Sequence, residues 1–445
     1  MDKVPAEPSP VLHFSFSTLG YKELGLEASL HQAIDKQASL FELNLSQKGL
    51  GPRFRELMET LAGRGRKVVL LIDEYDKPLV DYIEQKEIAE EHQGTMKSFF
   101  SVIKDSDAFI EFFLITGVSK FSKVSLFSDL NHLRDLTLVG ELASLTGYTQ
   151  KELERYFDQE IKEMAHRRGV SVRALWESIK EWYNGYNWSG EAMLYNPFSI
   201  LNFMSSRMFR NFWWETGTPT FLIRQLRQGF HYDFSDLEAG GTLFESYTLD
   251  DLEWRSLLFQ TGYLTIKSYD EEYDVYSLGY PNREVKDSML QHLMGAFTYE
   301  SKTQAKPIYA KLKRSLDAND IPSFISLVNV LLATIPYQIF IEKKEAFFHA
   351  VLHLTFQGLG LLTQSEVSTS KGRVDTIVHA KNHIYLMEFK LDGSAESALG
   401  QIKAKQYSQG LMGQDKEVVA LGINFNSETR AVAEYLVETY QTPKG

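Results

Sequence analysis

The pattern of aliphatic runs in residues 1–146 is the strongest constraint on the fold of this chain. Short β-prone runs at Val11–Ser17, Lys67–Ile72 and Ile110–Thr116 alternate with helical stretches such as Arg53–Ala62. Strands that are apolar at almost every position are typical of a parallel sheet, whose faces are both buried under the connecting helices. The sequence therefore predicts an open α/β domain with a parallel sheet covered on both faces.

Residues 147–201 carry the signals of helix starts. Thr149 followed by Glu152 matches a capping box, and the helix that it opens is predicted to stop at Gly169. Asn196 and Pro197 supply an N-cap and the proline that favours the first helical position. We therefore expect a helical lid over this region.

Residues 202–335 mix both kinds of pattern. Tyr263–Ser268 and Tyr273–Leu278 flank an acidic turn and predict a hairpin. Ser288–Phe297 and Ile325–Ile335 predict helices. We interpret this region as a mixed α+β connector.

Residues 336–445 predict a separate small α/β domain. A helix rich in His, Phe and Leu comes first, and two strands follow at Val374–Ala380 and His383–Lys390. A helix, a strand at Val418–Asn424 and a final helix complete the order α-β-β-α-β-α. The whole chain is therefore expected to belong to the α/β class and to divide into these four parts.

Composition narrows the classes of function. The chain has 445 residues, no cysteine and a formal net charge of -12. A metal must therefore bind carboxylates or histidines. The negative net charge disfavours a protein that coats nucleic acid, although a local basic cleft stays compatible with it.

The apolar runs are far shorter than the roughly 20 residues that cross a bilayer, and residues 1–10 lack the apolar stretch of a signal peptide. We expect a cytoplasmic protein without membrane contacts.

Three charged residues near the C-terminus are predicted to meet on one face of a hairpin. If Lys381 and Asn382 form its tight turn, the register sets Asp375 opposite Glu388, with Cβ atoms roughly 4.5–5.5 Å apart. Lys390 follows Glu388 by two positions and therefore shares its face. Two carboxylates and one ammonium group converge.

The facing carboxylates need a positive partner, because like charges set opposite each other destabilise a sheet. Mg²⁺ or Mn²⁺ suits this role, since such ions prefer oxygen ligands, lower the pKa of a bound water and neutralise charge on a phosphodiester. Lys390 would then stabilise or orient the nucleophile. The alternative is a solvated surface with a weak salt bridge. Against it, Tyr385–Lys390 is too apolar for an exposed strand.

These residues resemble the PD-(D/E)XK nuclease superfamily. The match consists of Asp375, then Glu388-Phe389-Lys390, then a helix with Gln401 and Tyr407, and it covers residues 340–430. The resemblance implies that Asp375 and Glu388 bind metal and that Lys390 assists the nucleophile. It also implies that Gln401 is the polar residue of the following helix.

The preceding helix adds further candidates. Glu345 matches the position from which a third carboxylate often joins the metal site of this superfamily. Val374 stands where the superfamily name has proline. His349 and His353 share one face of the same helix, and we interpret them as packed core histidines, with metal binding as the alternative.

A second site is predicted where Asp73 and Glu74 follow the run Val68–Ile72. This is the form of a Walker B strand, whose Asp holds Mg²⁺ and whose Glu polarises a water. The alternative is a pair of acids that cap the next helix. The segment resembles an AAA-ATPase-like family that is found joined to such nuclease-like domains, and the resemblance implies that Thr116 lies near the γ-phosphate. The motifs that carry it are Asp73–Pro78, Phe113–Val118, Tyr195–Ser199, Thr216–Pro219 and Thr261–Thr265.

The glycine-rich loop of such ATPases does not occur in the sequence. No G-x-x-x-x-G-K-[ST] string is found, and Gly94–Ser98 has only the Lys-Ser ending. Three explanations stay open: a truncated start, a natural variant without ATPase activity, or a partner chain that supplies the loop. We expect ATP binding to be weak or absent.

The sequence as a whole favours a metal-dependent nuclease that acts on DNA or RNA and is coupled to a degenerate AAA-ATPase-like domain. One alternative is a nucleic-acid-binding or regulatory scaffold with weak catalysis. Another is an ATP-dependent switch, if a missing N-terminus or a partner supplies the loop. Assembly into a homo-oligomer is a further open alternative.

Overall fold

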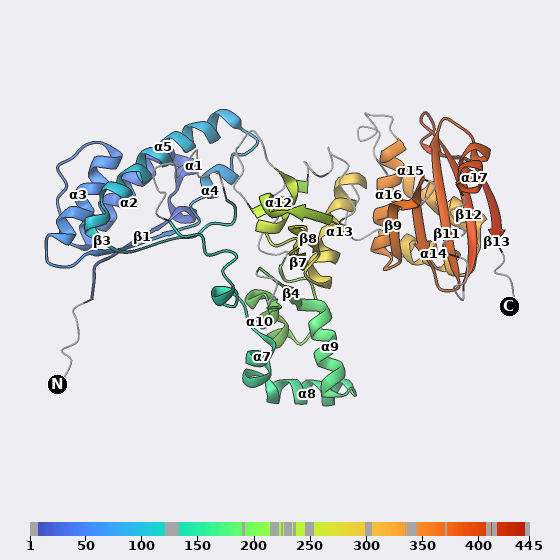
Figure 1. Cartoon of the computed structure of the whole chain (residues 1–445), viewed down its shortest axis with the longest axis horizontal. Coiled ribbons are helices and arrows are strands. Elements are labelled where there is room, and N and C mark those ends of the chain that lie inside the picture. Colours follow the sequence, from blue (N-terminus) through green and yellow to red (C-terminus); the bar gives the residue numbers. More distant parts are fainter. Residues whose placement is uncertain are drawn as a thin grey trace. The chain divides into compact units, whose positions relative to one another are not determined.

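The computed structural model in Figure 1 divides into two compact units. The first comprises Met1–Leu145, Trp188–Glu191 and Ala239–Tyr276, and the second comprises Thr146–Asn187, Ala192–Glu238 and Ser277–Gly445. The predicted motif Thr216–Pro219 and the predicted helix residue Tyr407 lie outside the described residues. The structure describes residues 8–120, 133–188, 192–213, 222–223, 226, 234, 237–244, 253–298, 305–333, 335, 345–369, 372–405, 411 and 416–440.

The first unit contains a parallel three-stranded sheet, as the aliphatic runs predict. Strands β1 (Val11–Ser15), β2 (Val68–Asp73) and β3 (Ile110–Ile115) lie in the order β1-β2-β3, and both pairings are parallel. The carboxyl ends of the three strands therefore meet at one edge of the sheet. The helices between them are α1 (Tyr21–Leu24), α2 (Leu26–Leu40), α3 (Leu50–Ala62), α4 (Lys77–Val80) and α5 (Lys86–Asp105).

Among the described residues, helices cover one face of this sheet. Helices α2, α3 and α5 lie on the same side (Figure 1), where the Phe14 ring packs 5.2 Å from that of Phe54 and 5.5 Å from that of Phe99. On the other face, Phe112 and Leu114 are 52% and 39% exposed. The prediction of burial on both faces is therefore wrong for the described part of the chain. The apolar pattern of a strand shows which faces carry apolar side chains, but it does not show whether another element packs on each face.

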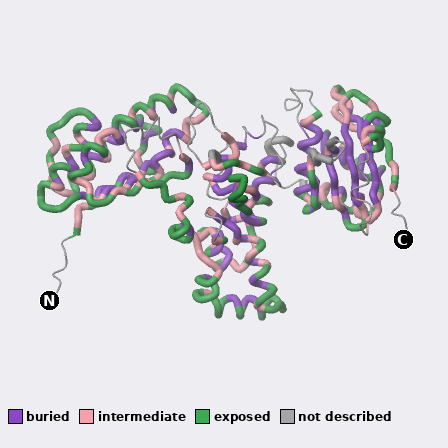
Figure 2. The backbone as a smooth tube through the Cα atoms, in the orientation of Figure 1, coloured by how far each residue is buried: buried purple, intermediate pink, exposed green. Residues whose placement is uncertain are grey.

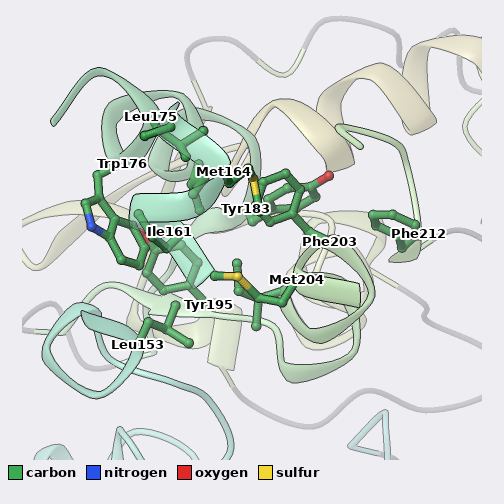
Figure 3. Packing of buried hydrophobic residues seen from close by; sticks show 13 residues of the cluster. Leu153, Ile161, Met164, Leu175, Trp176, Tyr183, Tyr195, Phe203, Met204 and Phe212 are labelled. Carbon is green, nitrogen blue, oxygen red and sulfur yellow. The ribbon is translucent and has the colours of Figure 1, made fainter. Parts of the chain in front are cut away.

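Residues 147–201 form mainly helices, as predicted. The Thr149 side chain accepts a hydrogen bond from the Glu152 amide and the Glu152 carboxylate accepts one from the Thr149 amide, so the capping box is confirmed. Asn196 caps the next predicted helix. Figure 3 shows the buried core of this region, which includes Tyr183 and Phe203. The elements are α7 (Gln150–Tyr156), α8 (Asp158–Arg168), α9 (Val172–Tyr183), β4 (Asn184–Tyr186), β5 (Leu194–Tyr195) and α10 (Pro197–Ser206).

Residues 202–335 contain both strands and helices. Strands β7 (Thr265–Asp270) and β8 (Val275–Gly279) are neighbours in a three-stranded sheet of order β6-β8-β7, as the predicted hairpin requires. The four-part division of the chain stays a prediction. The other elements described here are β6 (Leu237–Gly240), α12 (Trp254–Gln260), α13 (Arg283–Thr298), α14 (Ala305–Asp317) and α15 (Ile321–Ala333).

The C-terminal domain is built on a five-stranded mixed sheet of order β13-β12-β11-β10-β9. Only the pairing of β11 with β12 is parallel, and these two strands are buried along most of their length (Figure 2). Helices α16 and α17 pack against this sheet. In chain order the elements are α16 (Glu345–Gly358), β9 (Leu362–Thr369), β10 (Gly372–His379), β11 (His383–Leu391), α17 (Ala395–Ala404), β12 (Glu417–Asn426) and β13 (Ala431–Tyr440).

Two elements of this domain differ from the prediction. Strand β9 is additional, and the predicted final helix is wrong, since Ala431–Tyr440 forms strand β13. The segment contains helix-favouring Ala, Glu and Leu, but it pairs antiparallel with β12 along its whole length. Pairing at the edge of a sheet outweighs the small local preference for helix.

Helix α17 lies so close to β12 that Gly422 has no room for a side chain. A Cβ atom at this position would lie 2.6 Å from the Ala395 carbonyl oxygen and 2.6 Å from the Leu399 amide nitrogen. We expect Gly422→Ala to displace α17 and to lower the free energy of unfolding by about 1–3 kcal/mol in chemical denaturation.

The matched control for this substitution is Gly400→Ala. Gly400 lies within α17, and nothing lies within 4 Å of an added Cβ atom. Because alanine favours a helix over glycine, this variant is expected to gain about 1 kcal/mol. Equal stability of Gly422→Ala and the parent chain would contradict the close packing of α17.

Candidate functional site

The hairpin of β10 and β11 has the register that the sequence predicts. Thr376 pairs with Met387, so the next facing positions are Asp375 and Glu388. Two hydrogen bonds join these positions: the Asp375 amide donates to Glu388 Oε2 at 3.4 Å, and the Phe389 amide donates to Asp375 Oδ2 at 2.8 Å. One oxygen of each carboxylate is thus tied to the backbone of the opposite strand.

Glu388 is the buried member of this pair. Its side chain is 0% exposed, and Lys390 Nζ lies 3.5 Å from Glu388 Oε1. The same ammonium group donates to the Phe389 carbonyl at 2.9 Å. Burial, followed by the charge of Asp375, raises the pKa of Glu388 to about 7. The site therefore resists a second negative charge, and a nearby cation would relieve this resistance.

The pair can offer one oxygen of each carboxylate to a divalent cation. Glu388 Oε1 is buried and has no hydrogen-bond partner in the described ranges, while Asp375 uses Oδ2 for its bond to the Phe389 amide and keeps Oδ1. Mg²⁺ is commonly held by one or two carboxylates, with waters and substrate phosphates completing its shell. Asp375 and Glu388 together can supply this set of ligands.

Among the described residues, neither Glu345 nor Gln401 forms a hydrogen bond to the carboxylates of the pair. Glu345 Oε2 accepts a hydrogen bond from the Leu391 amide at 3.1 Å. Burial raises the pKa of Glu345, and the charge of Lys390 opposes this rise. Gln401 is half-buried on α17, and its side chain makes no hydrogen bond to either carboxylate within the described part of the chain. Among those residues, no three acidic or histidine side chains are grouped as a metal site.

Two of the residues predicted to bind nucleotide meet at the carboxyl edge of the N-terminal sheet. Thr116 Oγ1 donates a hydrogen bond to Asp73 Oδ1, and both residues are exposed. Glu74 follows with φ of 52°, in the left-handed region, so the chain turns sharply as strand β2 ends. The strand ends therefore present an accessible carboxylate beside a hydroxyl.

Asp76 is a residue of the same motif whose role the sequence pattern does not reveal. Its carboxylate is 1% exposed and accepts hydrogen bonds from the Val118 amide at 3.1 Å and the Ser119 amide at 2.7 Å. A Cβ atom at Gly117 would lie 2.6 Å from the Tyr75 ring. The motif after β2 and the motif after β3 therefore interlock. Both motifs are visible in the sequence, but the contact between them is not.

Two family models match the chain. One, described as a predicted AAA-ATPase, matches residues 3–127, and the other, described as the PD-(D/E)XK nuclease superfamily, matches residues 343–435. The first match contains the Asp73–Thr116 contact, and the second contains the Asp375–Glu388 pair. The chain therefore combines an AAA-ATPase-like domain with a PD-(D/E)XK nuclease superfamily domain.

A relative from Azotobacter chroococcum mcd 1 is 35% identical over 442 residues, which cover 97% of this chain and 83% of the relative. This relative is named "Uncharacterized protein in vnfD 5'region". The chain belongs to the same protein family as this relative. No solved structure matches the chain. None of the helices in the described ranges has the length and apolar character that a membrane crossing requires.

The raised pKa of Glu388 predicts a stability that depends on pH. Between the ordinary value of 4.5 and the folded-state value of about 7, the unfolded chain loses this proton before the folded chain does. Stability therefore falls as the pH rises through this window. In chelator and without metal, we expect Glu388→Gln to be more stable than the parent by up to about 3 kcal/mol at pH 8, and by less than about 1 kcal/mol at pH 5.

Chemical denaturation at the two pH values measures this difference. Glu428→Gln is the matched control, because Glu428 is an exposed carboxylate of the same domain and no gain at pH 8 is expected from it. If Glu388→Gln and the parent have the same free energy of unfolding at pH 8, the ionised Glu388 carboxylate does not destabilise the fold, and the prediction is wrong.

Proposed function

We propose that this chain is a metal-dependent nuclease and that Asp375, Glu388 and Lys390 form its active site. The observation that carries the proposal is the buried carboxylate of Glu388, which faces Asp375 and keeps one oxygen without a hydrogen bond in the described ranges. Buried groups with strongly perturbed pKa values cluster at functional sites. The PD-(D/E)XK match over the same residues supports nucleic acid as the substrate.

Each residue of the proposed active site and its neighbours has a proposed role. Asp375 and Glu388 would hold Mg²⁺ or Mn²⁺, which when bound neutralises charge on a phosphodiester and lowers the pKa of a bound water. Lys390 would stabilise the attacking oxygen or the charge that develops on the phosphate. Gln401 would contribute a polar side chain from α17. Glu345 would add a third ligand through its other oxygen, Oε1, while Oε2 keeps its hydrogen bond to the Leu391 amide.

For the AAA-ATPase-like domain we propose a regulatory role without ATP hydrolysis. Asp73, Glu74 and Thr116 offer a carboxylate and hydroxyl edge that suits Mg²⁺. A nucleotide also needs backbone amides around its phosphates, and the sequence has no glycine-rich string that would supply them. An oligomer or a partner chain that supplies the loop is the alternative for this domain.

We expect the chain to cleave labelled DNA or RNA when Mg²⁺ or Mn²⁺ is added. Asp375→Ala and Lys390→Ala should each lower the cleavage rate by about 100-fold or more, because each removes a charge from the reacting centre. Lys403→Ala is the matched control: its ammonium group pairs with Glu438, and it should cleave at the parent rate.

Single- and double-stranded substrates, each with and without metal, separate the possible outcomes. Cleavage that persists in both site variants would contradict the nuclease proposal. Tight binding of metal and nucleic acid by the parent chain without any cleavage would support a regulatory scaffold instead.

We also expect the purified chain to release no phosphate from ATP, because the sequence has no glycine-rich loop whose backbone amides would bind the triphosphate. A phosphate-release assay at saturating ATP and Mg²⁺ measures this directly. Steady release that is abolished by Asp73→Ala would overturn this expectation and favour an ATP-dependent switch.

A further inference from the structure

His349 connects helix α16 to the carboxylate pair. It is 7% exposed, and its Nε2 atom lies 2.7 Å from the Asp375 carbonyl oxygen and 2.9 Å from Thr376 Oγ1. A carbonyl oxygen can only accept a hydrogen bond, so Nε2 must carry the hydrogen. A protonated nitrogen cannot ligate a metal. Through Nε2, His349 therefore acts on the backbone of Asp375 and not on an ion.

This bond completes the restraint of Asp375. Its amide donates to Glu388 Oε2, its Oδ2 accepts from the Phe389 amide, and its carbonyl accepts from His349. Three hydrogen bonds at three different atoms fix both the backbone and the side chain of the residue. A metal-binding carboxylate has to be held to within about 0.5 Å of its working geometry.

His349 also touches the second strand of the site. Its ring packs against that of Phe389, with centroids 5.3 Å apart and the planes at 63°. Phe389 lies between Glu388 and Lys390 in the sequence, and its amide holds Asp375 Oδ2. One buried side chain thus contacts β10 and β11 where the two carboxylates face each other.

We propose that His349 is a positioning residue that sets the Asp375 carboxylate for metal binding. This inference rests on the proposed function, since it assigns a supporting residue to the same site. Partners that orient the ligands of a metal site typically change metal affinity by about 10–100-fold when they are removed.

His353 provides a matched comparison on the same helix. It is 0% exposed, and it bonds Gln357 Nε2 at 2.7 Å and also Ser365 Oγ. Ser365 belongs to β9, which carries none of the proposed ligands. Loss of His353 should therefore disturb the core of the domain without disturbing Asp375 directly.

The test compares variants of these two histidines that keep or lose a hydrogen-bond donor at the end of the side chain. Glutamine can place its amide nitrogen where His349 Nε2 lies. Methionine is close to glutamine in size and shape but has no hydrogen-bond donor. We expect His349→Gln to bind Mn²⁺ within about threefold of the parent and His349→Met to bind it about 10–100-fold more weakly. His353→Met should bind within about threefold. Calorimetric titration of the chain with Mn²⁺ measures affinity independently of cleavage.

Asp375→Ala separates failure of this inference from failure of the proposed function. Undiminished Mn²⁺ binding by Asp375→Ala would overturn the proposed metal site and this inference with it. If Asp375→Ala loses Mn²⁺ binding and His349→Met binds like the parent, the inference alone is overturned. Equal losses in His349→Met and His353→Met would also overturn it, because they would reveal a general effect on the core.

A second measurement needs no variant to fold. Imidazole nitrogen chemical shifts of the parent chain report which ring nitrogen of His349 carries the hydrogen. We expect a protonated Nε2, as the bond to the Asp375 carbonyl requires. An unprotonated Nε2 would overturn the inference.

Discussion

The burial of Glu388 opposite Asp375 is the constraint on which the C-terminal domain depends. An ionised carboxylate inside an apolar strand is costly unless it is paired and fully hydrogen-bonded. Here the backbone holds one oxygen of each carboxylate, and the Lys390 ammonium group lies 3.5 Å from Glu388 Oε1. The hairpin therefore maintains two fixed carboxylates whose charge is incompletely balanced, and this imbalance is what a bound cation would correct.

Asp76 in the N-terminal domain shows the opposite solution to the same problem. It is as deeply buried as Glu388, but the amides of Val118 and Ser119 satisfy its carboxylate. It therefore joins the loop after β2 to the loop after β3. Asp73, three residues earlier, is exposed, and among the described residues its carboxylate accepts a hydrogen bond from Thr116. The hydrogen bonds that a carboxylate receives thus separate a structural acid from one that is available for a ligand.

Much of the fold could be predicted from sequence because local rules decide it. A tight turn fixes a hairpin register, so the facing of Asp375 and Glu388 follows from their spacing. Short aliphatic runs separated by helices are typical of a parallel sheet, and β1, β2 and β3 do pair in parallel. The features that the sequence does not reveal depend on contacts between distant segments: the pairing that makes Ala431–Tyr440 a strand, the exposure of Phe112 and Leu114 on β3 among the described residues, and the bond of Glu345 to the Leu391 amide.

A crystal structure of the chain soaked with Mn²⁺ tests the central claim most directly. Anomalous scattering locates the ion without reference to any assay. The claim predicts one strong peak at coordination distance from both Asp375 and Glu388, with Glu388 Oε1 turned toward the ion. No peak at this pair, or a peak held by other residues while the two carboxylates keep their present contacts, would contradict it.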